Sequence, residues 1–310
     1  MPFPGMKSRE EKTMLWKENS PRISDGLVSS GGRRSCGHSE CAGGWVAPWR
    51  NRSRPVFEGQ WGCSDRCVQV MVRASIQREA GDAAVGDDSG PHKHRIPLGL
   101  VMLAQGWITH PQLQKALELQ RTNGTGRIGD WLMQECGLGT EHVARGLSVQ
   151  WNCPVLDTSG FSAGAMALAM PRLFAEEFGA LPLRVAGNRM IYMAFEDRLD
   201  ASVAFAMERM NGLKVQSGLL ETAQFRAARE QLLSCEGVGL KLETLQGRDA
   251  LAARVATVLD QRLPLEARLV RVHQYYWLRL WLESGTVGRA GRLPVGGEDM
   301  ADYVFTLGAG

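Results

Sequence analysis

A pattern of 24 residues occurs twice in the middle of this chain, almost back to back. The first copy spans residues 97–120 (PLGLVMLAQGWITHPQLQKALELQ) and the second spans residues 127–150 (RIGDWLMQECGLGTEHVARGLSVQ). The copies match at equal offsets: Gly99 with Gly129, Met102 with Leu132, Ile108 with Leu138, Leu113 with Val143, Leu117 with Leu147 and Gln120 with Gln150. A repeat of fixed period is one supersecondary unit used twice, so the two copies can also share one ligand.

Each copy predicts a helical hairpin. In the first copy a short apolar face is interrupted at Gly106, and Thr109 then begins a second helix. Gln112 is the capping-box partner of Thr109, and Pro111 lies in the first turn. The corresponding helix of the second copy begins at Gly139 or Thr140. We therefore expect a tandem helical-hairpin domain over residues 93–151.

Residues 152–234 predict a small α+β domain. Two apolar runs, 180–185 and 190–195, flank Gly187-Asn188, which is typical of an antiparallel hairpin. The other expected elements are two helices, a strand and a further helix, over residues 171–178, 200–210, 213–219 and 222–233. The predicted fold class is α+β, with a small zinc finger, the tandem hairpins and this domain in order along the chain.

Four of the seven cysteines lie near the N-terminus in two close pairs, Cys36 with Cys41 and Cys63 with Cys67. The N-terminus shows no secretory signal, which favours metal binding over disulfides. Two close pairs separated by a short loop suit a tetrahedral structural zinc site. We expect a zinc finger over residues 34–80; the alternatives are four reduced cysteines, or His38 in place of one cysteine ligand.

The loop between the cysteine pairs mixes aromatic and basic side chains: Trp45, Trp49, Phe57 and Trp61 with Arg50, Arg52 and Arg54. Such a mixture can bind nucleic acid through phosphate contacts and base stacking. The aromatic residues can equally form the core of a very small domain, and we favour this interpretation. The whole chain is close to neutral, with 36 basic and 33 acidic side chains, which argues against a general nucleic-acid binder.

The flanking segments are less informative. We expect residues 1–33 to be disordered and residues 81–92 to form a linker. Residues 235–310 predict a C-terminal extension with a helix over 248–263, a long or bent strand over 267–283 and a last strand over 303–307. One face of the long strand carries Tyr275, Trp277, Arg279 and Trp281, which could bind a partner but which we expect to pack on the 248–263 helix.

Several function classes are excluded by missing patterns. The sequence contains no phosphate loop, no nucleophile elbow and no H-E-x-x-H pair, so we expect no enzymatic activity. No apolar run approaches the roughly 20 residues that span a bilayer. We therefore expect a cytoplasmic protein with no membrane insertion.

The repeat and the segment after it, about residues 95–233, resemble the N-terminal (MshEN-type) domain of type II secretion and type IV pilus assembly ATPases. That family pattern is Arg-Leu-Gly, two apolar residues, Gly, an apolar pair, and a helix ending in Gln, in tandem. The chain lacks the phosphate loop of the family's motor domain. The stretch WGCSDRC resembles the Cys-Ser-x-x-Cys of treble-clef fingers of the FCS/MYM kind.

The resemblance implies a bacterial regulatory or adaptor protein. Some family members bind cyclic di-GMP, and others keep the fold as a protein-docking module. The positions carried over for the nucleotide are Leu98, Gly99, Gln120, Arg127, Ile128, Gly129, Leu132 and Gln150. Two positions depart from the pattern. Pro97 replaces Arg, and whether Arg95, two residues earlier, substitutes for it stays open; Cys136 replaces Gly, with Gly137 adjacent.

Three functions stay open on this basis. The expected one is a non-catalytic adaptor with a protein partner in a secretion, pilus or signalling assembly, with structural zinc and with cyclic di-GMP as candidate ligand. The alternatives are a docking scaffold without a nucleotide and a nucleic-acid-binding regulator acting through the zinc finger; we consider a nucleic-acid partner the least expected.

Overall fold

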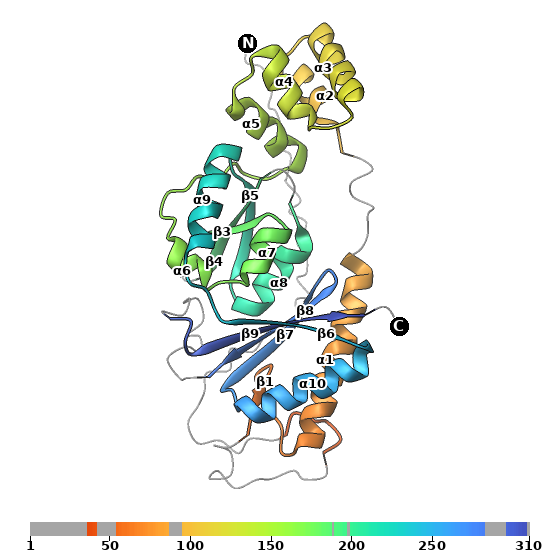
Figure 1. Cartoon of the computed structure of the whole chain (residues 1–310), viewed down its shortest axis with the longest axis vertical. Helices are drawn as coiled ribbons and strands as arrows, with labels where there is room; N and C mark the ends of the chain where they lie inside the picture. Colours follow the sequence, from red (N-terminus) through yellow and green to blue (C-terminus); the bar gives the residue numbers. More distant parts are fainter. Residues whose placement is uncertain are drawn as a thin grey trace, which may run out of the picture. The chain divides into compact units, whose positions relative to one another are not determined.

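The computed structural model describes residues 36–41, 54–86, 95–187, 189–196, 199–282 and 296–308. Arg33–Gly310 form one compact unit. The predicted disorder of residues 1–33 lies outside the described residues, as do Trp45, Trp49, Arg50 and Arg52 of the basic–aromatic loop. Figure 1 shows the described elements along the chain.

The tandem repeat folds as two helical hairpins, as predicted. Its helices are α2 (Leu98–Ala104), α3 (His110–Asn123), α4 (Ile128–Cys136) and α5 (Thr140–Trp151). The backbone N–H of Thr109 donates to Oε1 of Gln112 at 2.8 Å, which fixes the start of α3. Gly124 and Gly137 end α3 and α4 in the left-handed conformation that a glycine adopts without strain.

The two hairpins pack on each other reciprocally. The first helix of each copy lies against the second helix of the other, so that α2 packs on α5 and α4 packs on α3. Their shared core is small and apolar, and consists of Leu98, Met102, Ile108, Leu113, Ala116 and Leu132. This exchange of contacts relates the copies by an approximate twofold axis.

The predicted α+β domain is also confirmed. Its helices are α6 (Ala163–Ala167), α7 (Arg172–Glu177), α8 (Ala201–Asn211) and α9 (Thr222–Ser234), and its strands are β3 (Ala180–Ala186), β4 (Met190–Phe195) and β5 (Lys214–Leu219). The sheet order is β3-β4-β5; β3 and β4 are antiparallel, as expected, and β4 and β5 are parallel. Asn188, part of the expected turn, lies outside the described residues.

A second sheet follows, with strands β6 (Leu240–Leu245), β7 (Glu266–Val272), β8 (Tyr275–Trp281) and β9 (Met300–Leu307), and with helix α10 (Gly247–Arg262). The strand order is β6-β9-β8-β7. The prediction of one long or bent strand over 267–283 is wrong, because the chain reverses at His273 and forms the β7–β8 hairpin. His273 has φ 51°, a conformation that hairpin turns usually assign to asparagine or glycine. The sequence has neither residue at this turn, so no local signal predicts it.

The aromatic–arginine face of β8 does not pack on α10, contrary to expectation. The opposite face, with Tyr276, Leu278 and Leu280, meets α10. Trp277 and Trp281 belong instead to the core of the α+β domain. A buried guanidinium requires acceptors, and on that side of the sheet Asp302 and the backbone of the segment after α6 supply them.

Arg279 is the buried guanidinium of this face. Its side chain is 1% exposed and forms a bidentate pair with Asp302, with nitrogen–oxygen distances of 2.8 and 2.7 Å. It also donates to the carbonyl oxygens of Leu168 and Ala169 at 2.9 and 3.0 Å. The pair therefore joins the second sheet to the segment after α6.

The two ends of the chain share one core. The N-terminal segment forms β1 (Val56–Phe57), β2 (Gln60–Trp61) and α1 (Asp65–Gly86), and α1 packs on α10 and β7 (Figure 1). Phe57, Val72 and Ile76 are buried together with residues of α10 and β8. The sequence predicts separate domains over residues 34–80 and 235–310, but a segment as short as the first cannot bury enough apolar surface alone.

The expected linker is also displaced. Residues 81–86 belong to α1, and the rest of the expected linker lies outside the described residues. No helix of the described residues has the length and apolar composition needed to cross a bilayer.

Candidate metal centre and tandem-repeat site

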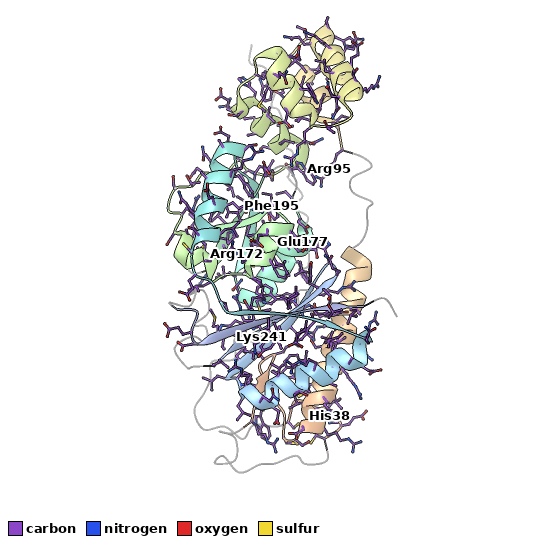
Figure 2. All side chains as sticks on the ribbon, viewed as in Figure 1. His38, Arg95, Arg172, Glu177, Phe195 and Lys241 are labelled. Atoms are coloured by element: carbon purple, nitrogen blue, oxygen red, sulfur yellow. The ribbon has the colours of Figure 1, made fainter. Side chains whose placement is uncertain are left out.

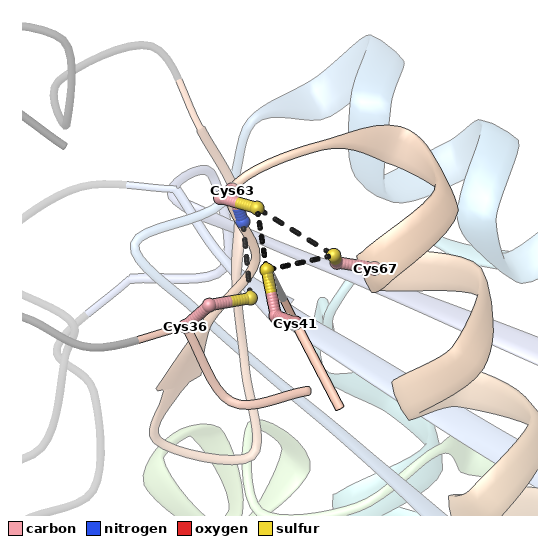
Figure 3. A group of neighbouring side chains, drawn as sticks. All are labelled: Cys36, Cys41, Cys63 and Cys67. Atoms are coloured by element: carbon pink, nitrogen blue, oxygen red, sulfur yellow. Dashed lines mark hydrogen bonds between the residues drawn. The ribbon is translucent and has the colours of Figure 1, made fainter. Parts of the chain in front are cut away.

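The four predicted zinc ligands converge on one point. The sulfur atoms of Cys36, Cys41, Cys63 and Cys67 all lie within 4.8 Å of one another (Figure 3). Three of the Sγ–Sγ distances are 3.3 Å (Cys41–Cys63), 3.5 Å (Cys63–Cys67) and 3.7 Å (Cys41–Cys67). A tetrahedral Zn²⁺ with Zn–S bonds of about 2.3 Å requires sulfur–sulfur separations of about 3.8 Å, so the cluster can hold such an ion.

Three local structures bring the sulfurs together. Cys36 and Cys41 flank a tight turn in which the Cys41 N–H donates to the His38 carbonyl oxygen at 3.1 Å. Cys63 closely follows β2, and Gly37 N–H bonds the Trp61 carbonyl oxygen at 2.8 Å, which holds the turn beside that strand. Cys67 lies in the first turn of α1.

The crowded sulfur atoms affect the ionisation of Cys63. Burial and the adjacent thiols raise the pKa of the Cys63 thiol to about 12. A divalent ion reverses this effect, because it deprotonates the thiols that bind it. His38 Nδ1 lies 3.5 Å from Cys67 Sγ, beside the cluster, and the four cysteines complete the ligand set without it.

The terminal glutamines of the two copies make equivalent hydrogen bonds. Gln120 Nε2 donates to the carbonyl oxygen of Gly126, the residue before the second copy, at 3.0 Å. Gln150 Nε2 donates to the carbonyl oxygen of Ile96, the residue before the first copy, at 2.9 Å. Each glutamine therefore lies beside the start of the other copy, which extends the reciprocal packing to polar groups.

The motif glycines allow the helices of each copy to approach closely. A Cβ atom at Gly99 would lie 2.5 Å from Leu113 Cδ1, and one at Gly129 would lie 3.1 Å from Val143 Cγ1. Leu98 and Leu132 are buried, and Ile128 packs against the same core. Of the eight predicted nucleotide residues, these five thus contribute to packing, and Arg127 and the two glutamines present polar groups at the surface.

The starts of the two copies differ in charge. Arg127 precedes α4, its side chain is 56% exposed, and its Nη1 lies 3.9 Å from Glu196 Oε1. Pro97 holds the equivalent place before α2. Arg95, labelled in Figure 2, stacks its guanidinium on Trp151, 3.4 Å from the ring centre. Trp151 was missed from the sequence because nothing in the motif marks it.

A buried charged cluster around Glu79 was also not predicted from the sequence. Glu79 of α1 is 3% exposed, its Oε1 lies 2.7 Å from Arg209 Nη1, and its Oε2 accepts from the Arg271 N–H at 2.9 Å. Burial raises the pKa of this carboxyl group, and the hydrogen bond from Arg271 and the charge of Arg209 oppose the rise. Glu79 thus connects α1 with α8 and β7.

An open hollow of about 420 Å³ lies elsewhere, between α7 and α9. Its lining includes Arg172, Arg226 and Arg229. The first two pair with Glu176 and Glu196, and Arg229 donates to the carbonyl oxygens at the end of α7. These contacts satisfy the arginines within the chain.

No protein-family model and no curated protein matches this chain. Among solved structures it is similar to MshE with cdg, at 23% identity and TM-score 0.37, over 44% of this chain and 99% of that one. It is also similar to the N-terminal domain of XpsE in two crystal forms. One has 15% identity and TM-score 0.30 over 43% and 92% of the two chains; the other has 14% and 0.25 over 42% and 90%.

Proposed function

We propose that this chain is a non-catalytic regulatory adaptor whose tandem hairpins bind cyclic di-GMP. The reciprocal packing of the two copies is the observation that carries the proposal. Cyclic di-GMP consists of two identical halves related by a twofold axis. A receptor built from two reciprocally packed copies offers each half of that ligand an equivalent set of groups.

Arg127 and Gln120 form the stronger half of the proposed site. Gln120 binds the carbonyl oxygen of Gly126, the residue directly before Arg127, so its amide lies beside the backbone from which the Arg127 side chain projects. A guanidinium can donate two hydrogen bonds to phosphate or to the guanine edge. The second amide hydrogen and the oxygen of the glutamine are suited to a base edge.

The ion pair between Arg127 and Glu196 is weak. The pair is long, at 3.9 Å, and the arginine side chain is more than half exposed. Exposed pairs of this kind contribute about 1 kcal/mol or less. A ligand phosphate can therefore displace Glu196 from Arg127.

The half-site at the start of the first copy is weaker, because Pro97 supplies neither charge nor an N–H. Gln150 is its only polar member from the motif, since it lies beside Pro97 through its bond to Ile96. The absence of one charged hydrogen bond costs about 1.5–3 kcal/mol. We therefore expect a Kd about 10- to 100-fold higher than that of a site with both arginines.

We further propose that the cysteine cluster holds one structural Zn²⁺. Cys36, Cys41, Cys63 and Cys67 would bind it, and the ion would fix the hairpin β1–β2 against the start of α1. The sulfur geometry supports this assignment. The ion contributes stability to the shared core and no reactive group.

Calorimetric titration of cyclic di-GMP into the full chain tests the nucleotide site. Arg127→Ala should weaken binding by at least tenfold. Arg172→Ala is a matched control, because Arg172 is 60% exposed, also pairs with a glutamate, Glu176, and lies outside the tandem repeat. Equal affinities for the wild type and Arg127→Ala would remove this residue from the site.

A docking scaffold without a nucleotide is the second candidate. Pro97 favours it, and so do the bonds that Gln120 and Gln150 make with backbone carbonyl groups. The same titration separates the two functions. A folded chain that gives no heat with cyclic di-GMP would leave the docking function.

A further inference from the structure

Strand β6 forms an open edge of the second sheet. It pairs with β9 on one side, and among the described residues no strand pairs with its other side. The opposite edge of the sheet, β7, is covered, because Val56 and Glu58 donate to the carbonyl oxygens of Pro264 and Ala267. An uncovered edge presents free N–H and C=O groups to another strand.

The exposed side chains of β6 are unusual for a free edge. Leu240 is 37% exposed and Leu242 is 58% exposed. They lie on the face that carries Val304, and Lys241 and Glu243 lie on the face that carries Tyr303 and α10. The strand thus combines an apolar face with a charged face.

The hydrogen bonds to β9 determine which backbone groups of β6 are free. Asp302 N–H donates to the Gly239 carbonyl oxygen at 3.0 Å, and Gly308 N–H donates to that of Leu245 at 2.9 Å. Successive residues of a strand direct their backbone groups to alternate sides. The backbone N–H and C=O groups of residues 241 and 243 therefore point toward β9. Those of residues 240, 242 and 244 point toward the open side.

We propose that β6 pairs antiparallel with β6 of a second copy of this chain, centred on Leu242. In this register the Leu242 N–H of each copy donates to the Leu242 carbonyl oxygen of the other, and Leu240 exchanges the same two bonds with Thr244. Lys241 of each copy then lies opposite Glu243 of the other copy, which gives two equivalent pairs related by the twofold axis. These are non-hydrogen-bonded pairs, in which the side chains approach most closely. Such a self-complementary contact is typical of a closed dimer.

Neighbouring registers are worse. A shift of the centre to residue 241 places Lys241 opposite itself, and a shift to residue 243 places Glu243 opposite itself; like charges opposite each other are destabilising. Pairing between an inward and an outward residue forms no ladder hydrogen bonds. Among the registers centred on residues 241, 242 and 243, the one centred on Leu242 satisfies both the backbone and the charges.

The two charged side chains are already held on the correct face. Lys241, labelled in Figure 2, places its Nζ 5.5 Å from the centre of the Tyr303 ring. Glu243 accepts two hydrogen bonds of 2.7 Å from Arg254. Both are therefore oriented before a second copy arrives.

Sedimentation of the full chain tests the dimer. The wild type should sediment with twice the mass of one chain, and K241E and E243K should each sediment as monomers. An equimolar mixture of K241E and E243K should recover the dimer, because a strand with two acidic side chains then faces a strand with two basic ones, and both cross-strand contacts are attractive. Lys214→Glu, the same charge change at an exposed position of β5, should leave the dimer intact.

A merely unfolded variant cannot produce this recovery on mixing. Leu242→Lys provides a second check, since Leu242 is largely exposed in the single chain and would face its own copy in the dimer. It should also give a monomer. A monomeric wild type, dimeric single variants or a mixture that stays monomeric would each overturn the proposal.

Discussion

The buried pair of Arg279 and Asp302 permits a quantitative prediction. Asp302→Ala removes two charge-assisted hydrogen bonds from a guanidinium whose side chain is 1% exposed, and it also removes the acceptor of Trp277 Nε1 at 2.9 Å. Only the carbonyl oxygens of Leu168 and Ala169 then remain for Arg279. An uncompensated buried charge of this kind costs about 3–5 kcal/mol.

Urea unfolding followed by tryptophan fluorescence measures this loss, because Trp277 lies in the affected core. Asp260→Ala, at an exposed position of α10, is the control and should change stability by no more than about 0.5 kcal/mol. The double change Arg279→Met with Asp302→Leu should recover most of the stability, since an apolar replacement avoids the stranded charge. A loss below about 1 kcal/mol for Asp302→Ala would refute this account of the pair.

Three further predictions concern the metal cluster, the repeat and the dependence on pH. Cys67→Ser, or a chelator, should lower the melting temperature of the core shared by α1 and α10, and not only that of the cysteine segment; an unchanged melting curve would contradict the proposed zinc. Gly99→Val should destabilise the repeat by roughly 1–3 kcal/mol through overpacking against Leu113, measurable by urea unfolding, and a neutral effect would argue against close packing there. Burial alone would raise the pKa of Asp200, but hydrogen bonds from His273 and from the N–H at the start of α8 hold it below its usual value. Its contribution is therefore present above the unfolded pKa of about 3.9 and is lost as pH falls through the lower folded value, so Asp200→Asn should flatten the acid limb of stability against pH.

The sequence predicted the elements whose signals are local. Helical spacing and the capping box at Thr109 located the tandem hairpins, and the apolar runs around Gly187 located the β3–β4 hairpin. The turn at His273 carries no glycine or asparagine, so β7 and β8 were merged. Strand β6 is short and largely exposed, and it was missed although Leu240 and Leu242 alternate with Lys241 and Glu243.

Long-range packing could not be read from local patterns. Nothing near Phe57 or Val72 indicates that these residues pack on α10, which lies far along the chain. For the candidate sites, cysteine spacing was sufficient because a metal requires only four sulfurs at one point. The motif residues of the repeat could be named as a group from the sequence, but their division into packing residues and surface polar groups required the structure.

Cyclic di-GMP binding by the full chain is the central claim, and calorimetric titration with three ligands tests it most directly. Cyclic di-GMP should bind with one ligand per chain and more tightly than its linear dinucleotide or GTP, because only the cyclic form has the twofold symmetry of the repeat. Equal binding of all three ligands, or no heat from cyclic di-GMP with a chain shown to be folded, would contradict the account.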